Sequence, residues 1–369
     1  MNVRIFFRLF ILLAGAMLYS GYGRADSWQQ AVTARVSTEY ETNPAMSSTS
    51  PEGVWRGLFE PGYALIGMVG DNEIRTGLAV QMARASNKKL SPDRDSPSVF
   101  LNWLRQGETG GFDISSRYTE VSTREVDGID AAGLVPASST RVSRTLTGKW
   151  NKEMSELSTV SLDGSYDRVS YRGGTYVNYS TQTVGLTFSR AWDEHITPYI
   201  RVSGNKYESE GEGQSSRRND ASIGLDWKAE YLVWSMQAGQ SRVVGGNTST
   251  QGSVETKYTG QLNQLGLIAS RQVVPSGLGG FVKADQLSGN WSYALSEYSR
   301  TGLNLVWQKN LSSENSSTSA SSDVWLEHNL NALWTLRTHY QHRTSDVAGS
   351  ESVSSDIFGL SFAYAYSDF

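Results

Sequence analysis

Residues 286–295 of the chain read QLSGNWSYAL, and this stretch decides the fold. Every second residue, from Leu287 through Trp291 to Leu295, is apolar, aromatic or glycine, and the residues between them are small or polar. An alternation of period two is typical of a strand that has one apolar and one polar face. A length of about ten residues is also what a tilted strand needs to cross a bilayer.

The same alternation recurs along the whole chain after residue 27. In residues 73–84, for example, Glu73 and Arg75 share one face while Ile74 and Leu78 share the other. Marking every such segment predicts eighteen strands, and sixteen is the alternative count. The predicted strands are 28–41, 54–69, 73–84, 98–106, 112–123, 141–150, 157–168, 176–190, 197–207, 220–229, 232–242, 253–260, 264–273, 281–295, 298–309, 322–330, 333–343 and 353–366.

Short and long connections alternate between these strands. The short ones follow every even strand, as at 70–72, and the long polar ones follow every odd strand. The long loops are predicted at 42–53, 85–97, 124–140, 169–175, 208–219, 243–252, 274–280, 310–321 and 344–352. Short periplasmic turns and long extracellular loops are typical of an outer-membrane barrel. The sequence therefore predicts an all-β protein, a single transmembrane antiparallel β-barrel in the cell outer membrane.

The composition agrees with a barrel once the alternation is known. The 369 residues include 36 Gly, 8 Pro and no Cys, and the absence of Cys excludes disulfides and thiolate metal sites. A mean hydropathy of −0.40 fits a chain that turns only half of each strand toward lipid. A soluble β-sandwich is the alternative, but it would need more continuous apolar surface than these half-polar strands offer. Five tryptophans near short turns favour a membrane interface: Trp150, Trp192, Trp227, Trp234 and Trp334.

The first 25 residues have the pattern of a secretory signal peptide. Arg4 and Arg8 precede an apolar run at 9–18, and small residues at Gly23 and Ala25 suit a cleavage site. We expect residues 1–25 to be the signal peptide and 26–369 to form the barrel, with an uncleaved membrane anchor as the alternative. Removing this basic segment makes the net charge of −4 more negative, which argues against nucleic acid as a partner.

The last residue, Phe369, suggests an assembly signal. A terminal aromatic on an alternating strand resembles the signal that the outer-membrane barrel assembly machinery reads, so that machinery is an expected partner. However, Phe362, Tyr364 and Tyr366 share an even-numbered face, whereas Phe369 is odd. The register is therefore off by one unless a bulge intervenes near residues 367–368.

Residues for catalysis or metal binding are scarce, so we expect a protein that is not an enzyme and holds neither metal nor cofactor. Of four histidines, His339 and His342 fall on opposite faces of one strand, which spoils them as a metal pair. Asp163 and Asp167 share a face but are about 13 Å apart, too far for paired-carboxylate glycoside chemistry. The acidic run 208–212 is predicted to be a solvated loop, with a cation site bridging lipopolysaccharide as the alternative.

The polar faces of the predicted strands should line the pore. The expected pore-lining residues are Arg75, Asp113, Arg117, Arg141, Lys149, Asp163, Asp167, Arg201, Asp226, Lys228, Asn290, Asn304 and Arg337. Their charges are nearly balanced, which does not predict strong ion selectivity. Many neutral hydroxyl and amide groups lie around them, and such groups suit sugars. Few aromatic residues point inward on this register, namely Phe100, Tyr199 and Tyr298.

One segment carries a family resemblance. Residues 270–282 read SRQVVPSGLGGFV and lead into Asp285 and Leu287. They resemble the outer-membrane β-barrel family associated with exosortase/PEP-CTERM and related exopolysaccharide systems, and the family-like loop is formed by Pro275, Ser276, Gly277 and Gly279. The resemblance implies a barrel that takes part in secreting a polysaccharide across the outer membrane, together with a periplasmic polysaccharide-export protein. It carries over no catalytic residue.

Three functions follow from these patterns. An exopolysaccharide-secretion porin is favoured by the resemblance and the polar pore. A general or sugar-selective diffusion porin explains the strands equally well and predicts a loop folded inside as a constriction, although no predicted loop exceeds about 17 residues. An outer-membrane enzyme would need a histidine-based site, which the four histidines do not offer. In each case the barrel would contact outer-membrane lipid and lipopolysaccharide.

Overall fold

The computed structural model describes residues 27–49, 51–123, 125–126, 139–173, 176–210, 215–311 and 316–367, which form eighteen strands. The strands are β1 (Ser27–Glu41), β2 (Val54–Val69), β3 (Asn72–Ala85), β4 (Arg94–Gly107), β5 (Gly110–Ser122), β6 (Thr140–Ser155), β7 (Ser158–Arg172), β8 (Tyr179–Arg190), β9 (Ile196–Ser209), β10 (Ser215–Lys228), β11 (Leu232–Val243), β12 (Thr248–Thr259), β13 (Asn263–Pro275), β14 (Phe281–Ala294), β15 (Ser299–Leu311), β16 (Ser316–Asn329), β17 (Trp334–Val347) and β18 (Val353–Ser367). The described residues contain no helix of the length and apolarity needed to cross a membrane.

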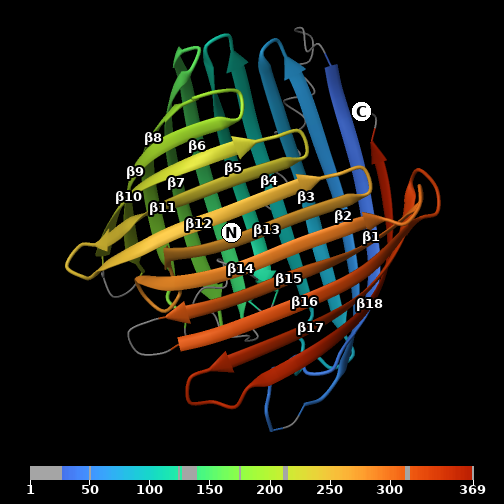
Figure 1. The fold of residues 1–369 in the computed structure, drawn as a ribbon. Helices are drawn as coiled ribbons and strands as arrows, with labels where there is room; N and C mark the ends of the chain where they lie inside the picture. Colours follow the sequence, from blue (N-terminus) through green and yellow to red (C-terminus); the bar gives the residue numbers. More distant parts are fainter. Residues whose placement is uncertain are drawn as a thin grey trace.

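The strands form one closed antiparallel sheet. Each strand pairs with its neighbours in the sequence, and β1 pairs with both β2 and β18. Figure 1 shows the strands of one wall, β10–β16, running obliquely across those of the other wall, β2–β7, as tilted strands do in a barrel. Closure leaves no exposed sheet edge, which a membrane-spanning sheet requires. The predicted fold class, an antiparallel barrel of eighteen strands, is confirmed.

Several strands extend further into the predicted loops than the sequence pattern indicated. β10 begins at Ser215 rather than 220, β12 at Thr248 rather than 253, and β16 at Ser316 rather than 322. These extensions are rich in Ser, Thr and Arg, and both of their faces lie beyond the apolar band. Hydrophobic alternation therefore ends while backbone pairing continues, and loops such as 244–247 are shorter than predicted.

The two faces of each strand can be assigned from contacts that skip over neighbouring strands. The phenol hydroxyl of Tyr207 on β9 reaches the backbone oxygen of Ser276 beyond β13, and a guanidinium nitrogen of Arg218 on β10 donates to the backbone oxygen of Val273. Such contacts cross the interior, so Tyr207 and Arg218 face the lumen. Residues paired with them in register share that face around the sheet.

The opposite face forms the lipid-facing surface. Leu162, Ile200, Ile223 and Leu305 are each more than two fifths exposed there, as expected for side chains that contact lipid rather than a protein core. Trp227 and Trp234 pair directly across the β10–β11 turn, at the end where the short turns lie. We call this the turn end, and the opposite end, with the connections 42–53, 86–93 and 123–139, the loop end.

Two expectations fall outside the described residues. The predicted signal peptide, residues 1–25, and the terminal residue Phe369 both lie there. Both stay predictions from the sequence.

Candidate pore and constriction

The structure places the thirteen predicted pore-lining residues on the inner face of the strands. Register pairs link them around the barrel: Arg75 lies opposite Asn102, Arg201 opposite Thr187, and Asn290 opposite Asn304. The loop residues Pro275, Ser276, Gly277 and Gly279 lie at the tip of the β13–β14 hairpin. The thirteen residues thus share one face of the sheet, and their role as pore lining stays a prediction from the sequence.

Inner carboxylates are held in place by neighbouring side chains, either by a cation or by a neutral hydrogen-bond donor. The guanidinium of Arg201 donates to both carboxylate oxygens of Asp163, with its Nη2 2.7 Å from Oδ2. Asn102 Nδ2 lies 2.7 Å from Asp113 Oδ1, and Ser235 Oγ donates to Asp226 at 2.6 Å. The ion pair presents little net charge to a passing ion, whereas Asp113 and Asp226, bound to neutral donors, keep theirs.

A second charge cluster spans three strands on the far side of the pore. Asp323 on β16 accepts a hydrogen bond from Asn304 on β15 at 2.9 Å and lies 3.6 Å from the guanidinium of Arg337 on β17. The same guanidinium lies 4.6 Å from the ring centre of Trp325, a cation–π contact. Trp325 is thus a further inward aromatic residue besides the predicted Phe100, Tyr199 and Tyr298.

The inner face of β11–β15 is almost free of charge, and we call it the neutral wall. In these five strands, which the structure describes in full, the inward charges are Glu255, Lys257 and Arg300, all near the turn end. One register row across the wall consists of Gln237, Ser253, Ser270, Gln286 and Gln308. Ser270 Oγ and Gln308 Oε1 are buried without a hydrogen-bond partner.

The inner face of β1–β10 carries most of the charge, and we call it the charged wall. Near its loop end, the buried guanidinium of Arg56 lies 2.9 Å from Glu39, 3.4 Å from Glu41 and 3.5 Å from Glu125. Glu125 follows β5, so residues of the third long connection enter the lumen. Burial raises the pKa of the Glu125 carboxyl above its ordinary value, and the nearby cations of Arg56 and Arg94 partly offset this.

The β13–β14 turn, residues 275–281, spans part of the loop-end mouth, and we call it the constriction turn. The backbone nitrogen of Val177, next to β8, donates to the backbone oxygen of Gly277 at 2.8 Å. The hydroxyl of Tyr207 donates to the backbone oxygen of Ser276 at 3.2 Å. Both partners belong to the charged wall, so the turn leaves the neutral wall and reaches across the pore.

An aromatic cluster holds the constriction turn in place. Tyr207 is 1% exposed, and its ring lies 5.2 Å from that of Tyr179 and 5.8 Å from that of Phe281. The guanidinium of Arg218 lies 5.2 Å from the ring centre of Phe281. Burial of stacked rings stabilises such a contact well beyond its single hydrogen bonds. The expectation of few inward aromatics is therefore wrong at the loop end.

Three positions of the constriction turn favour glycine, one because of limited space and two because of the backbone conformation. A Cβ atom on Gly277 would lie 2.8 Å from the hydroxyl oxygen of Tyr171, so a side chain there would force either the turn or the ring of Tyr171 to shift. Gly279 and Gly280 have φ angles of 94° and 89°, which L residues rarely adopt. The turn is short, so it reaches the lumen by folding inward rather than by the length of a long loop.

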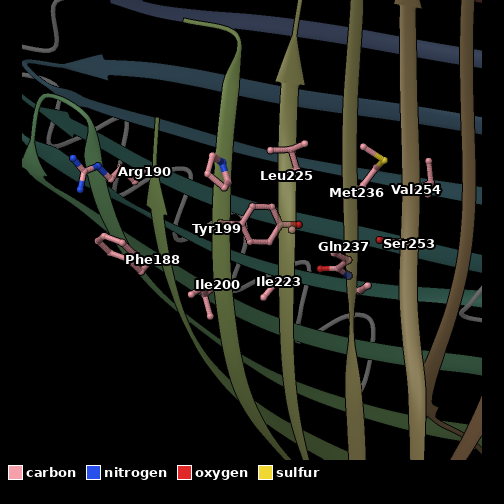
Figure 2. Close-up of a pocket in the computed structure, with 13 residues that line it drawn as sticks. Phe188, Arg190, Tyr199, Ile200, Ile223, Leu225, Met236, Gln237, Ser253 and Val254 are labelled. Carbon is pink, nitrogen blue, oxygen red and sulfur yellow. The ribbon is translucent and has the colours of Figure 1, made fainter. Parts of the chain in front are cut away.

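An apolar groove lies on the outer face of β8–β12. Figure 2 shows the side chains around it, among them Phe188, Ile200, Ile223 and Met236 from neighbouring strands. On the inner face of the same strands, behind the groove, the ring of Tyr199 lies against Gly224, where an added Cβ atom would be 2.1 Å from the ring. The groove therefore belongs to the lipid-facing surface and is separate from the pore.

The histidines lie as the strand periodicity predicts. His339 faces inward beside Gly359, whereas His342 faces outward, with its Nδ1 2.8 Å from Asp356. Among the described residues there is no group of three potential metal ligands. Of the acidic run, Glu208 pairs with Lys206, and Glu210 lies 2.6 Å from Arg168. These two glutamates are thus ion-paired, and residues 211–214 lie outside the described part.

Comparison with known proteins shows the fold. No family model matches the chain, and no curated protein sequence does. The barrel is similar to the outer membrane protein OpdK of Pseudomonas aeruginosa, with a TM-score of 0.51 and 10% identity over 94% of this chain and 100% of OpdK. OccK7 (OpdD) of the same organism gives a TM-score of 0.51 and 10% identity over 93% of this chain and 100% of its own. OpdK solved with vanillate gives 0.50 at 10% identity.

The likeness in fold and the lipid-facing apolar band both indicate a barrel that lies in a membrane. The chain has the fold of the outer membrane protein OpdK and is a β-barrel of the outer membrane.

Proposed function

We propose that the protein is a non-enzymatic diffusion channel for small hydrophilic solutes, narrowed at its loop end by the constriction turn. The observation that carries the proposal is the polar inner face, which ends in a turn held across the mouth by Val177 and Tyr207. A wet polar lumen lets a solute exchange hydrogen bonds with water and wall at little net free energy. The turn limits the size of the solute.

The charge arrangement supports modest selectivity. Paired groups such as Arg201 and Asp163 hold their charges within 3 Å of each other, so their fields largely cancel along the pore. The similar OpdK barrel has been solved with vanillate, a small organic anion. A solute of that size suits a channel whose mouth is partly closed.

Planar-bilayer recording and liposome swelling test the proposal. We expect stable single-channel conductance with weak ion selectivity, and swelling rates that fall steeply as the solute grows from a monosaccharide to a trisaccharide. A control with heat-unfolded protein should give neither signal. A folded barrel that neither conducts nor admits a monosaccharide would contradict the proposal.

A second candidate function is secretion of an exopolysaccharide with a periplasmic polysaccharide-export protein. It is supported by the S-R-Q-V-V-P-S-G-L-G sequence at 270–279 and by the neutral wall, whose amides and hydroxyls suit a chain of sugars. In this role the constriction turn has to leave the mouth before a polymer passes.

Deletion of the coding sequence in the source organism separates the two candidates. Loss of exported polysaccharide, restored by the wild-type chain, would support secretion. A wild-type level of exported polymer, together with slower uptake of a small solute, would support the diffusion channel alone.

A further inference from the structure

Four cations lie together on the outer face of β6–β10, and we call them the outer basic patch: Arg144, Arg168, Lys206 and Arg217. Their chain neighbours Thr145, Asp167, Tyr207 and Arg218 face the lumen, so these four side chains point away from it. Arg144, Arg168 and Arg217 are exposed, and Lys206 is partly exposed. The patch is therefore outside the pore and takes no part in the proposed channel.

The cations form two like-charge pairs across strands. Arg144 lies directly opposite Arg168 in the β6–β7 register, and Lys206 lies directly opposite Arg217 in the β9–β10 register. Like charges in directly opposed positions destabilise a sheet unless an anion lies between them. The intervening strand β8 presents Ser180 and Gln182 in the same two rows, and both can donate hydrogen bonds.

The carboxylates nearby do not balance the patch. Glu210 lies 2.6 Å from Arg168, and Glu208 pairs with Lys206. Arg144 instead lies 5.8 Å from the ring centre of Tyr118. Two carboxylates against four cations leave a net positive surface on a chain whose formal net charge is −4. This local excess of positive charge points to an anionic partner.

The position of the patch identifies the partner's chemistry. Leu146 and Tyr166, the next outward residues on β6 and β7, are 51% and 41% exposed and belong to the lipid-facing surface. The guanidinium groups therefore begin where the apolar surface ends, at the loop end, which is the extracellular side of such barrels. Phosphate groups of the outer leaflet lie at that level.

The apolar groove of Figure 2 lies on the same wall. Its residues Ile200 and Ile223 pair directly. Ile200 precedes Lys206 by six residues on β9, and Ile223 follows Arg217 by six residues on β10. Six residues of strand span about 20 Å, roughly the length of a fatty acyl chain. A lipid with its phosphate at the patch can thus extend an acyl chain into the groove.

We propose that the outer basic patch and the apolar groove form a binding site for lipid A, the diphosphorylated glycolipid anchor of lipopolysaccharide. Each cation pair holds one phosphate through charge-assisted hydrogen bonds, and the phosphate removes the repulsion within the pair. An acyl chain occupies the groove between Ile200 and Met236. The site accounts for two unfavourable features at once, the opposed cations and the grooved lipid-facing surface.

Native mass spectrometry of the folded barrel in detergent, with diphosphoryl lipid A as the probe, tests the site. The double variant Arg144→Ser/Arg168→Ser should bind about tenfold more weakly, because charge-assisted contacts to phosphate are lost. Lys206→Ser/Arg217→Ser tests the second pair independently, so the result does not depend on one variant folding. Single-channel conductance of both should stay at the wild-type value.

A matched control removes two outward arginines elsewhere. Arg84 and Arg271 lie 2.8 Å and 2.6 Å from Asp95 and Asp285, and in the strand pairing Arg84 lies opposite Gly57 and Arg271 opposite Gly252 and Asp285 rather than opposite another cation. Arg84→Ser/Arg271→Ser should bind lipid A as the wild type does. Equal weakening by the control, wild-type binding by both patch variants, or equally tight binding of phosphatidylglycerol would overturn the proposal.

Discussion

The charged wall and the neutral wall line the same lumen but are built differently. On the charged wall, ion pairs such as Arg201 with Asp163 fix each side chain and cancel its field. On the neutral wall, the row from Gln237 to Gln308 has no charge, and two of its polar atoms are buried without a partner. The comparison teaches that a charge added to the neutral wall would meet no counter-charge nearby, whereas one added to the charged wall would.

The largest expected effect concerns the contact that joins the two walls. In Gly277→Leu, the new side chain would overlap the Tyr171 ring, and we expect the constriction turn to move away from the charged wall. Single-channel conductance should rise severalfold. Gly148→Leu is the control, because a Cβ atom there meets nothing within 4 Å. Unchanged conductance in Gly277→Leu would show that the turn does not limit the current.

A second prediction places the same new charge on each wall. Gln286→Arg adds a cation with no counter-charge in its register row, whereas Ser165→Arg adds one beside Asp163 and Asp167. An unpaired charge changes the free energy of a passing ion by about 1 kcal/mol. The anion-to-cation permeability ratio should therefore rise severalfold in Gln286→Arg and little in Ser165→Arg. Reversal potentials in a salt gradient measure both, and equal shifts would remove the distinction between the walls.

A third, smaller effect should depend on pH. The raised pKa of Glu125 means that this carboxyl takes up a proton before an exposed glutamate does as the pH falls toward 4.5. The lumen near Arg56 then gains one positive charge, so anion selectivity should increase as the pH falls. Glu125→Gln should show the low-pH selectivity at neutral pH and lack this step. An identical pH profile in the wild type and the variant would contradict this role.

The smallest effect concerns two buried hydroxyl groups. Ser241 Oγ on the neutral wall has no hydrogen-bond partner, so Ser241→Ala should leave the free energy of unfolding unchanged or slightly raised. Ser355 Oγ accepts a hydrogen bond from the backbone nitrogen of Asn43 at 3.2 Å, so Ser355→Ala should lower that free energy by about 1 kcal/mol. Urea unfolding of the refolded barrel measures both, and the reverse order would contradict the assignment.

The strands and their register could be predicted from the sequence because lipid on one side and water on the other impose alternation. Leu78 and Arg75 were assigned to opposite faces from this pattern alone, and the structure agrees. Tyr179 and Tyr207 also had the inward parity, so the aromatic cluster was accessible to the same reasoning. Beyond the apolar band the pattern ends, which is why β10 and β16 were predicted too short.

The constriction could not be predicted because it rests on contacts between distant segments. Nothing in the local sequence of Ser276 or Gly277 indicates that their backbone oxygens accept hydrogen bonds from Tyr207 and Val177. The position of Glu125 beside Arg56 likewise depends on how a long connection enters the closed barrel. The opposed cations of the outer basic patch can be recognised only from the strand register, because an error of one residue in the register would place other residues opposite them.

The seam between β1 and β18 makes closure of the barrel depend on both ends of the described chain. Asn43 and Ser355, hydrogen bonded at the seam, are 312 positions apart in the chain. The outer edge of β1 has its partner only in β18. A chain interrupted anywhere before β18 therefore leaves two open edges that have no partner within the molecule.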